Sequence, residues 1–314
     1  MFQHLMCHTD AAQHRVGRHR IASQRMAGHG FPYDRTQPPR TLRDHIMISS
    51  HTVIVLHAHP DDEAIFTGLT MRRLADAGAR VVLVMATDGA AGVPHVPLSR
   101  GESLRSRRLT ELERACDLLG VARLEVLGYS DSGAHDGPYG AGSLGAACVT
   151  KVARQVARVA SREGASTVVH YDPGGIYGHI DHVQVHRVGA MVTRSLHLAG
   201  YQATVDALAL RAGPRHVLQR AAGGLTEVGV PASQISLTVN AEGPDLLAKM
   251  AAMATHSSQI VPADLDPTCF AAAYGREWFV REGQRGALDA LLAASAGQTA
   301  EVTHRGRQLD RSAA

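Results

Sequence analysis

Residues 53–63 read Val-Ile-Val-Leu-His-Ala-His-Pro-Asp-Asp-Glu. An apolar run rich in β-branched side chains ends among two histidines and three acids, and apolar residues at helical spacing follow at once. This order is typical of a buried strand that leads into an amphipathic helix. Because ligands of open α/β sheets bind at the carboxyl ends of the strands, we expect His59, Asp61 and Asp62 at that edge of the sheet.

Strand and helix signals alternate from Thr52 onward, which predicts an α/β fold: a Rossmann-like, mostly parallel sheet with helices on both faces. After the first strand, we expect helices over residues 63–77, 101–119, 144–163, 180–198 and 245–255. Further strands are expected over residues 81–86, 124–127, 166–170, 205–210 and 235–239. The glycine-rich segment 128–145 is predicted to be a loop long enough to be functional.

The two ends of the chain differ in composition from the middle. Residues 1–46 carry scattered arginines, histidines and glutamines without an apolar period, and they are predicted to form a disordered basic arm. The arm is either a tether to an acidic partner or an extension upstream of a second start at Met47, and we favour the second interpretation. Residues 47–298 are predicted to form a single domain, and residues 299–314 a disordered tail.

Composition excludes several classes of protein. The 314 residues are 45% apolar, enough for one large core, while a net charge of +3 and 4% aromatic residues argue against nucleic-acid binding. Four cysteines without a Cys-x-x-Cys pair indicate reduced thiols, and we expect a cytoplasmic protein. No segment approaches the roughly 20 apolar residues of a membrane helix, so we expect no membrane insertion. The oligomeric state is left open, a homo-oligomer included.

A second informative stretch, residues 170–186, reads His-Tyr-Asp-Pro-Gly-Gly-Ile-Tyr-Gly-His-Ile-Asp-His-Val-Gln-Val-His. It begins at the end of a predicted strand, so we expect it beside His59. Two imidazoles and one carboxylate with an open position for water are the pattern of hydrolytic zinc sites, and His59, Asp62 and His182 would supply it. His186 is an alternative to Asp62, because His182 and His186 are four apart on one helix face.

The segments 58–63 (Ala-His-Pro-Asp-Asp-Glu) and 178–182 (Gly-His-Ile-Asp-His) resemble the LmbE-like, or PIG-L, family of metal-dependent de-N-acetylases. This family includes the deacetylases of N-acetylglucosaminyl-phosphatidylinositol and of the mycothiol precursor. The similarity extends over about residues 53–281, since segments 127–133 and 256–259 also resemble family segments. It implies a zinc-dependent hydrolase that removes an N-acyl group, above all N-acetyl, from a glucosamine-type sugar or a related small metabolite through a metal-activated water.

The resemblance also implies roles for single residues. His59, Asp62 and His182 would ligate one divalent ion per chain, usually zinc, with Fe²⁺ or another divalent ion as the alternative. On this basis we favour Asp62 over His186, which becomes a core residue or a residue behind the ligands. Asp61 would be the general base that takes a proton from the attacking water and returns it to the leaving amine.

Further roles follow from the same resemblance. His179 would face the oxyanion as a protonated donor, with Asp181 tuning its charge. Tyr177 matches a mobile tyrosine near the substrate, and Arg108 and Asp131 match positions that hold the sugar in the mycothiol-precursor enzymes.

Several positions have a second interpretation. His57 is expected to be a packed histidine that points away from the site, because side chains alternate along a strand. Asp172 either caps a turn or orients a ligand histidine. The chain has Ala90-Ala91 where many relatives carry an acid, and Phe66 near the position of a lysine in enzymes that act on mycothiol conjugates. The substrate therefore stays open.

Two other functions remain as alternatives: an amidase of thiol-sugar conjugates, and a metal-binding or sugar-binding protein without turnover. Asp61 separates catalysis from binding, because a base is needed for water activation and not for holding a metal. A metal-dependent phosphoesterase is disfavoured, because such sites often hold two ions through more acids and histidines than are present here.

Overall fold

The computed structural model describes residues 48–133, 138–213, 216–221 and 228–296. The chain divides into two compact units, residues 1–39 and 40–314, and every described residue belongs to the second unit. The predicted arm over residues 1–46 and the predicted tail over residues 299–314 lie outside the described residues. Their disorder therefore stays a prediction.

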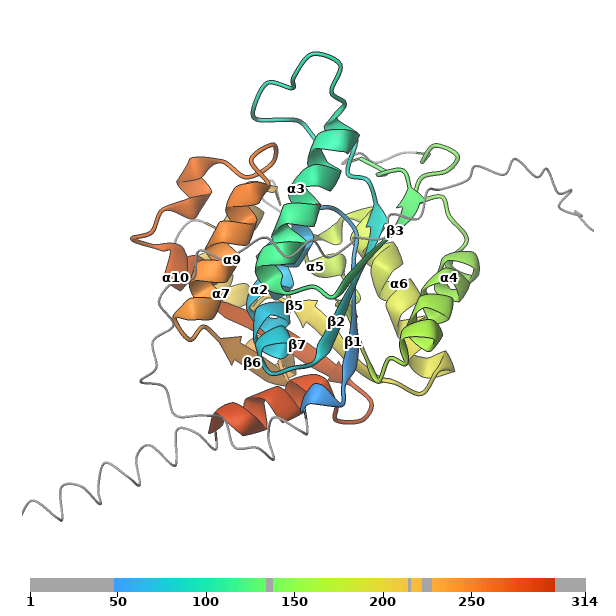
Figure 1. The fold of residues 1–314 in the computed structure, drawn as a ribbon, viewed down its shortest axis with the longest axis vertical. Helices are drawn as coiled ribbons and strands as arrows, with labels where there is room; N and C mark the ends of the chain where they lie inside the picture. Colours follow the sequence, from blue (N-terminus) through green and yellow to red (C-terminus); the bar gives the residue numbers. More distant parts are fainter. Residues whose placement is uncertain (1–47, 134–137, 214–215, 222–227, 297–314) are drawn as a thin grey trace, which may run out of the picture. The chain divides into compact units, whose positions relative to one another are not determined.

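A seven-stranded sheet with the order β3-β2-β1-β4-β5-β7-β6 forms the centre of the second unit (Figure 1). The first five strands in the chain run parallel to one another, and β7, which pairs with β5, and β6 are added at one edge through antiparallel pairing. The strands are β1 (Thr52–His57), β2 (Arg80–Thr87), β3 (Arg123–Tyr129), β4 (Thr167–Tyr171), β5 (Ala199–Thr204), β6 (Leu237–Asn240) and β7 (Arg276–Glu282). The predicted α/β fold with a mostly parallel sheet is thus confirmed.

Helices cover both faces of this sheet. On one face α2 and α3 pack against α9, and on the other α4 packs against α6 (Figure 1). The long helices are α2 (Asp62–Asp76), α3 (Leu104–Leu119), α4 (Val149–Glu163), α6 (Ile180–Ser195) and α9 (Pro244–Thr255). The short ones are α5 (Gly175–Gly178), α7 (Ala207–Ala212), α8 (Val217–Ala221), α10 (Phe270–Tyr274), η1 (Ala232–Gln234) and η2 (Pro262–Leu265). Within the described ranges, none of the helices combines the length and the apolar character that a membrane crossing requires.

One predicted strand was wrong. Residues 205–210 were expected to form a strand, but the strand is β5, over the preceding residues, and α7 begins at Ala207. The physical reason is Asp206, whose carboxylate accepts hydrogen bonds from the backbone N–H groups of Leu208 and Ala209 and so starts a helix. The strand β7 had no predicted counterpart.

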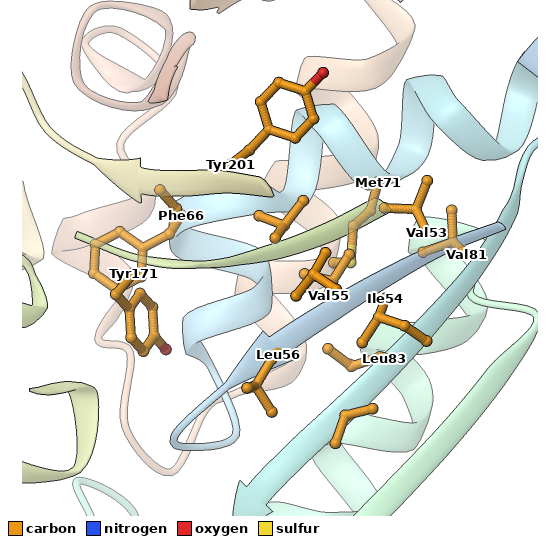
Figure 2. Packing of buried hydrophobic residues seen from close by; sticks show 14 of the residues in the cluster. Val53, Ile54, Val55, Leu56, Phe66, Met71, Val81, Leu83, Tyr171 and Tyr201 are labelled. Carbon is orange, nitrogen blue, oxygen red and sulfur yellow. The ribbon is translucent and has the colours of Figure 1, made fainter. Parts of the chain in front are cut away.

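The core is organised around β1, which lies between β2 and β4. Val53 and Val55 point to one side of the strand, and Ile54 and Leu56 to the other (Figure 2). All four side chains are buried, which explains why this strand is continuously apolar and does not alternate. Among the cysteines, Cys116, Cys148 and Cys269 are free, and Cys7 lies outside the described residues.

A buried ion pair ties helix α9 to the added strand β7, and its carboxylate also binds the backbone of helix α2. Glu277 lies 2.7 Å from Nζ of Lys249, and both side chains are only 1% exposed. The same carboxylate accepts hydrogen bonds from the backbone N–H groups of Leu69 and Thr70 at 2.8 and 2.9 Å, in the middle of α2. Gly68 allows the close approach, because a Cβ there would lie 3.1 Å from Cγ of Lys249.

We expect Glu277→Ala to lower the free energy of unfolding by about 3–5 kcal/mol, because it leaves the buried Lys249 without its partner. Urea denaturation followed by circular dichroism measures this change. Asp76→Ala is the matched control, since it breaks an exposed pair with Arg72 and should cost about 1 kcal/mol or less. Equal, small losses in both variants would contradict a stabilising role for Glu277.

Candidate metal centre

The site lies at the carboxyl ends of β1 and β4, where the order in which successive strands join the sheet reverses. The chain passes from β1 to β2 on one side and from β4 to β5 on the other, although β1 and β4 are hydrogen-bonded neighbours. The connections that leave these two carboxyl ends therefore diverge, and such a switch point is where α/β sheets bind ligands. The segment 58–63 follows β1, and the segment 172–182 follows β4. The two motifs predicted to be neighbours are brought together here.

Three potential ligand atoms form a nearly equilateral triangle at this point. Nδ1 of His59 lies 3.4 Å from Oδ2 of Asp62, Nε2 of His182 lies 3.3 Å from the same oxygen, and the two nitrogens are 3.2 Å apart. Metal–ligand bonds of about 2.0–2.1 Å in a tetrahedral zinc site place ligand atoms roughly 3.3–3.4 Å apart. All three side chains are buried. The residues present therefore fit one divalent cation.

His186 does not take part in this triangle. Its Nδ1 lies 3.0 Å from the backbone carbonyl oxygen of Tyr171, and its side chain is partly exposed. Among the described residues, the His/Asp groups with converging ligand atoms are His59, Asp62 and His182, and His59, Asp131 and His179. The structure thus favours Asp62 over His186 as the third ligand.

Tyr171 orients Asp62, and sequence reasoning missed it. Its hydroxyl donates to Oδ2 of Asp62 at 2.8 Å and accepts the backbone N–H of Ala58 at 3.1 Å. Its ring stacks on His182 with the centroids 4.2 Å apart. His57, predicted to be a packed histidine, is fully buried and has Nδ1 2.8 Å from the same hydroxyl. It therefore reaches the site only through Tyr171.

We expect Tyr171→Phe to weaken zinc binding by roughly 10–100-fold, because loss of an outer partner of a metal ligand has effects of this size. The phenyl ring keeps the stacking on His182, so the change isolates the hydroxyl. Chelator competition measures the Kd for zinc. Tyr201→Phe is the matched control, because Tyr201 is also buried but its hydroxyl bonds to Asp289. The same Kd in both variants and the wild type would refute this role.

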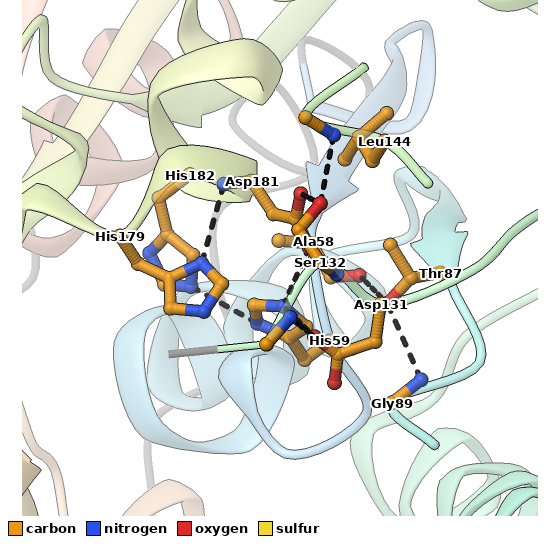
Figure 3. A network of polar contacts seen from close by, with 12 residues as sticks. Ala58, His59, Thr87, Gly89, Asp131, Ser132, Leu144, His179, Asp181 and His182 are labelled. Carbon is orange, nitrogen blue, oxygen red and sulfur yellow. Dashed lines mark hydrogen bonds and ion pairs between the residues drawn. The ribbon is translucent and has the colours of Figure 1, made fainter. Parts of the chain in front are cut away.

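The far nitrogen of His59 faces carboxylates. Nε2 lies 3.2 Å from Oδ2 of Asp181 and 3.6 Å from Oδ1 of Asp131 (Figure 3). Asp181 is itself held by Ser132, whose backbone N–H and hydroxyl both donate to it. A carboxylate behind a ligand histidine fixes its tautomer and ring orientation. Asp181, expected to tune the charge of His179, also raises the pKa of that ring, and Asp131, expected to hold a sugar, lies beside His59 as well.

His179 and Tyr177 line the site beside the triangle. The ring centroid of His179 is 4.6 Å from that of His59, and the Tyr177 ring is 4.9 Å from that of His182. Nδ1 of His179 accepts the backbone N–H of Asp181 at 3.2 Å. Burial lowers the pKa of His179 to about 4, and the two neighbouring histidines add to the shift. This opposes the cationic His179 that we expected and favours a neutral ring with its proton on Nε2.

Asp61 stands at the start of α2 with a φ of 117°, in the left-handed region. Nη2 of Arg108 lies 3.2 Å from Oδ2 of Asp61 and also donates to the carbonyl of Pro60, while Nη1 donates to the carbonyl of Gly89 at 2.7 Å. Burial raises the pKa of Asp61 to about 7, with the Arg108 guanidinium opposing the shift. We expected Arg108 to hold a sugar, but its guanidinium is buried and bound by the chain itself.

Asp172 fulfils the simpler of its two predicted roles. Its Oδ1 accepts the backbone N–H of Ile176 at 2.9 Å, and its Oδ2 accepts the hydroxyl of Thr204. Ile176 has a φ of 66°, so Asp172 stabilises the tight turn that leads from β4 to Tyr177.

The fold and the site together define an α/β protein with a candidate metal centre at the switch point of its sheet. The family model for GlcNAc-PI de-N-acetylase, PIG-L, matches residues 54–193. The 1D-myo-inositol 2-acetamido-2-deoxy-alpha-D-glucopyranoside deacetylase of Thermomonospora curvata is 32% identical over 272 residues, which are 74% of this chain and 91% of that protein. The protein of the same name from Kineococcus radiotolerans is 34% identical over 257 residues, 68% of this chain and 70% of that protein.

The chain belongs to the PIG-L, or LmbE-like, family of de-N-acetylases, and the predicted enzyme class, a hydrolase of linear amides, is confirmed. Solved structures agree on the fold. A deacetylase of the teicoplanin biosynthesis pathway superposes with a TM-score of 0.51 at 17% identity, covering 74% of this chain and 100% of that one. The zinc-inhibited form of teicoplanin deacetylase gives a TM-score of 0.50 at 18% identity, covering 74% of this chain and 100% of that one.

Proposed function

We propose that this protein removes the N-acetyl group from a glucosamine joined to an inositol, using one divalent cation held by His59, Asp62 and His182. The observation that carries the proposal is the triangle of ligand atoms with sides of 3.2, 3.3 and 3.4 Å. Relatives that match most of the chain, and that are named for the deacetylation of such a sugar, support the substrate class. Zinc is the ion we assign, with Fe²⁺ as the alternative to be tested.

Asp61 is the general base in this proposal. A bound zinc ion lowers the pKa of water from 15.7 to roughly 7, which is the chemistry that amide hydrolysis needs near neutral pH. Asp61 accepts the proton of the attacking water and later delivers it to the leaving amine. A carboxylate whose pKa burial raises to about 7 is well matched to both steps. Arg108 holds Oδ2 of Asp61, so we assign the proton transfer to Oδ1.

His179 stabilises the charge that develops on the carbonyl oxygen. Because its Nδ1 accepts a backbone N–H, the neutral ring carries its proton on Nε2 and donates from there. A preorganised donor of this kind contributes about 3 kcal/mol in comparable enzymes. Asp181 and Asp131 orient His59 from behind, and Tyr177, which is partly exposed beside His182, contacts the substrate.

An assay of acetate release tests the proposal. Purified protein loaded with Zn²⁺ or with Fe²⁺ is incubated with N-acetylglucosaminyl-inositol, with N,N'-diacetylchitobiose and with free N-acetylglucosamine. We expect the highest kcat/KM on the inositol conjugate, by about tenfold or more. Protein stripped by a chelator is the control. Absence of acetate from all three sugars at full metal loading would contradict the deacetylase proposal.

A further inference from the structure

We propose that Glu63 and His256 form a positioning pair that holds the backbone of Asp61 in its catalytic conformation. This inference rests on the proposed role of Asp61 as the base. It adds two residues that do not touch the metal triangle and that act on the reaction only through Asp61.

The backbone of Asp61 needs support. Its φ of 117° and ψ of −31° are unfavourable for any residue that has a Cβ. Such a conformation costs of the order of 1–3 kcal/mol and persists only where surrounding contacts determine it. Ile176 and His197 are the other non-glycine residues with positive φ in the described part of the chain. Asp61 and Ile176 both lie in the turns that leave β1 and β4, where the site is formed.

Both peptide groups of Asp61 are fixed by hydrogen bonds. Its N–H donates to Oε2 of Glu63 at 2.9 Å, so the glutamate reaches back from the first turn of α2. Its carbonyl oxygen accepts the N–H groups of Ala64 and Ile65 at 3.1 and 3.0 Å. Since the two peptide planes together set the direction of the Cα–Cβ bond, the Glu63 contact helps to set the direction in which the Asp61 side chain leaves the backbone, and Arg108 then holds its carboxylate.

His256 holds Glu63 from the other side. Nε2 of His256 lies 2.6 Å from Oε1 of Glu63, and both side chains are fully buried. One carboxylate oxygen of Glu63 therefore accepts the backbone N–H of Asp61, and the other contacts His256, which directly follows α9. Glu111 in turn accepts the N–H and the hydroxyl of Ser258, which fixes the segment that carries His256. The chain of contacts runs from α3 through His256 and Glu63 to Asp61.

We expect Glu63→Ala to lower kcat for acetate release by roughly 10–100-fold, with KM and metal content unchanged. Glu63→Gln keeps an acceptor oxygen for the Asp61 N–H and should recover most of the rate. Glu163→Ala is the matched control, because the side chain of Glu163 is only 7% exposed and pairs with Arg80. Arg80 is at the amino end of β2, whereas the site is at the carboxyl ends of the strands. This control variant should leave kcat unchanged.

A double-mutant cycle with Asp61→Asn separates positioning from a general structural role. If Glu63 acts through the base, Glu63→Ala causes no further loss of kcat in the Asp61→Asn background. His256→Gln should show the same non-additivity, and it provides the test if Glu63→Ala fails to fold.

Three outcomes would overturn the positioning role alone. They are an unchanged kcat in both the Glu63→Ala and the His256→Gln single variants, an equal loss in both backgrounds, and loss of the metal from those variants. A wild-type kcat in Asp61→Asn itself would instead overturn the proposed base, and the inference would fall with it.

Discussion

Asp61→Asn lowers kcat for acetate release by roughly 10²–10⁴-fold and leaves the metal content of the protein unchanged; this is the first of two large expected effects. Asparagine has nearly the shape of aspartate and is among the residues that best tolerate a positive φ, so the strained turn at 61 is preserved. Its amide cannot take a proton from water. The metal stays bound because Asp61 contributes no atom to the triangle of His59, Asp62 and His182.

The measurement is single-turnover kinetics of acetate release, with the bound metal counted in the same sample. Asp76→Asn is the matched control: it makes the same chemical change on the same helix, in an exposed pair with Arg72. It should leave kcat within about twofold of the wild type, since surface changes away from a site are nearly neutral. If Asp61→Asn were as active as the wild type at full metal loading, Asp61 would not be the general base and another group would have to take the proton from the water.

The second large effect concerns the metal. We expect His182→Ala to lose the cation on dialysis. Its activity should fall by more than the roughly 100-fold that is typical when a hydrogen-bond partner of a metal ligand is removed. Nε2 of His182 is one corner of the triangle, and the side chain is fully buried, so the alanine variant leaves only two of the three ligand atoms. Metal content by mass spectrometry and kcat are measured together.

His186→Ala is the matched control for this experiment. His186 is on the same helix one turn later, and its Nδ1 contacts the carbonyl oxygen of Tyr171. This variant should retain the metal. Loss of the metal in His186→Ala together with its retention in His182→Ala would contradict the ligand set.

Much of the fold and the metal centre could be predicted from local sequence. The apolar run before His59 and the valine-rich run before His170 mark buried strands, and polar residues directly after each strand mark the functional edge. Both motifs were expected at one edge, and the structure brings Asp62 and His182 within 3.3 Å of each other. The prediction succeeded because each motif spans only a few residues directly after its strand, and because parallel strands place their carboxyl ends together.

The partners of the ligands could not be predicted, because they depend on tertiary packing. Tyr171 reaches Asp62 only through the pairing of β1 with β4. The resemblance linked Asp181 to His179, and the structure adds that the Asp181 side chain contacts His59 while its backbone N–H donates to His179. Arg108 was predicted to face the substrate, but it is buried against backbone carbonyl groups from two other turns.

The strands β5 and β7 could not be predicted for a related reason. The strand β5 reads Ala-Gly-Tyr-Gln-Ala-Thr, which has little strand propensity of its own. It forms a strand because β4 pairs with it on one side and β7 on the other. Sheet pairing thus outweighs local preference here, and a single sequence does not reveal such a long-range partner.

The most direct test of the central claim is anomalous diffraction at the zinc edge from crystals of the zinc-loaded protein. The account predicts one strong peak per chain, within bonding distance of Nδ1 of His59, Oδ2 of Asp62 and Nε2 of His182. A peak between His182 and His186, or one that lacks contact with Asp62, would contradict it.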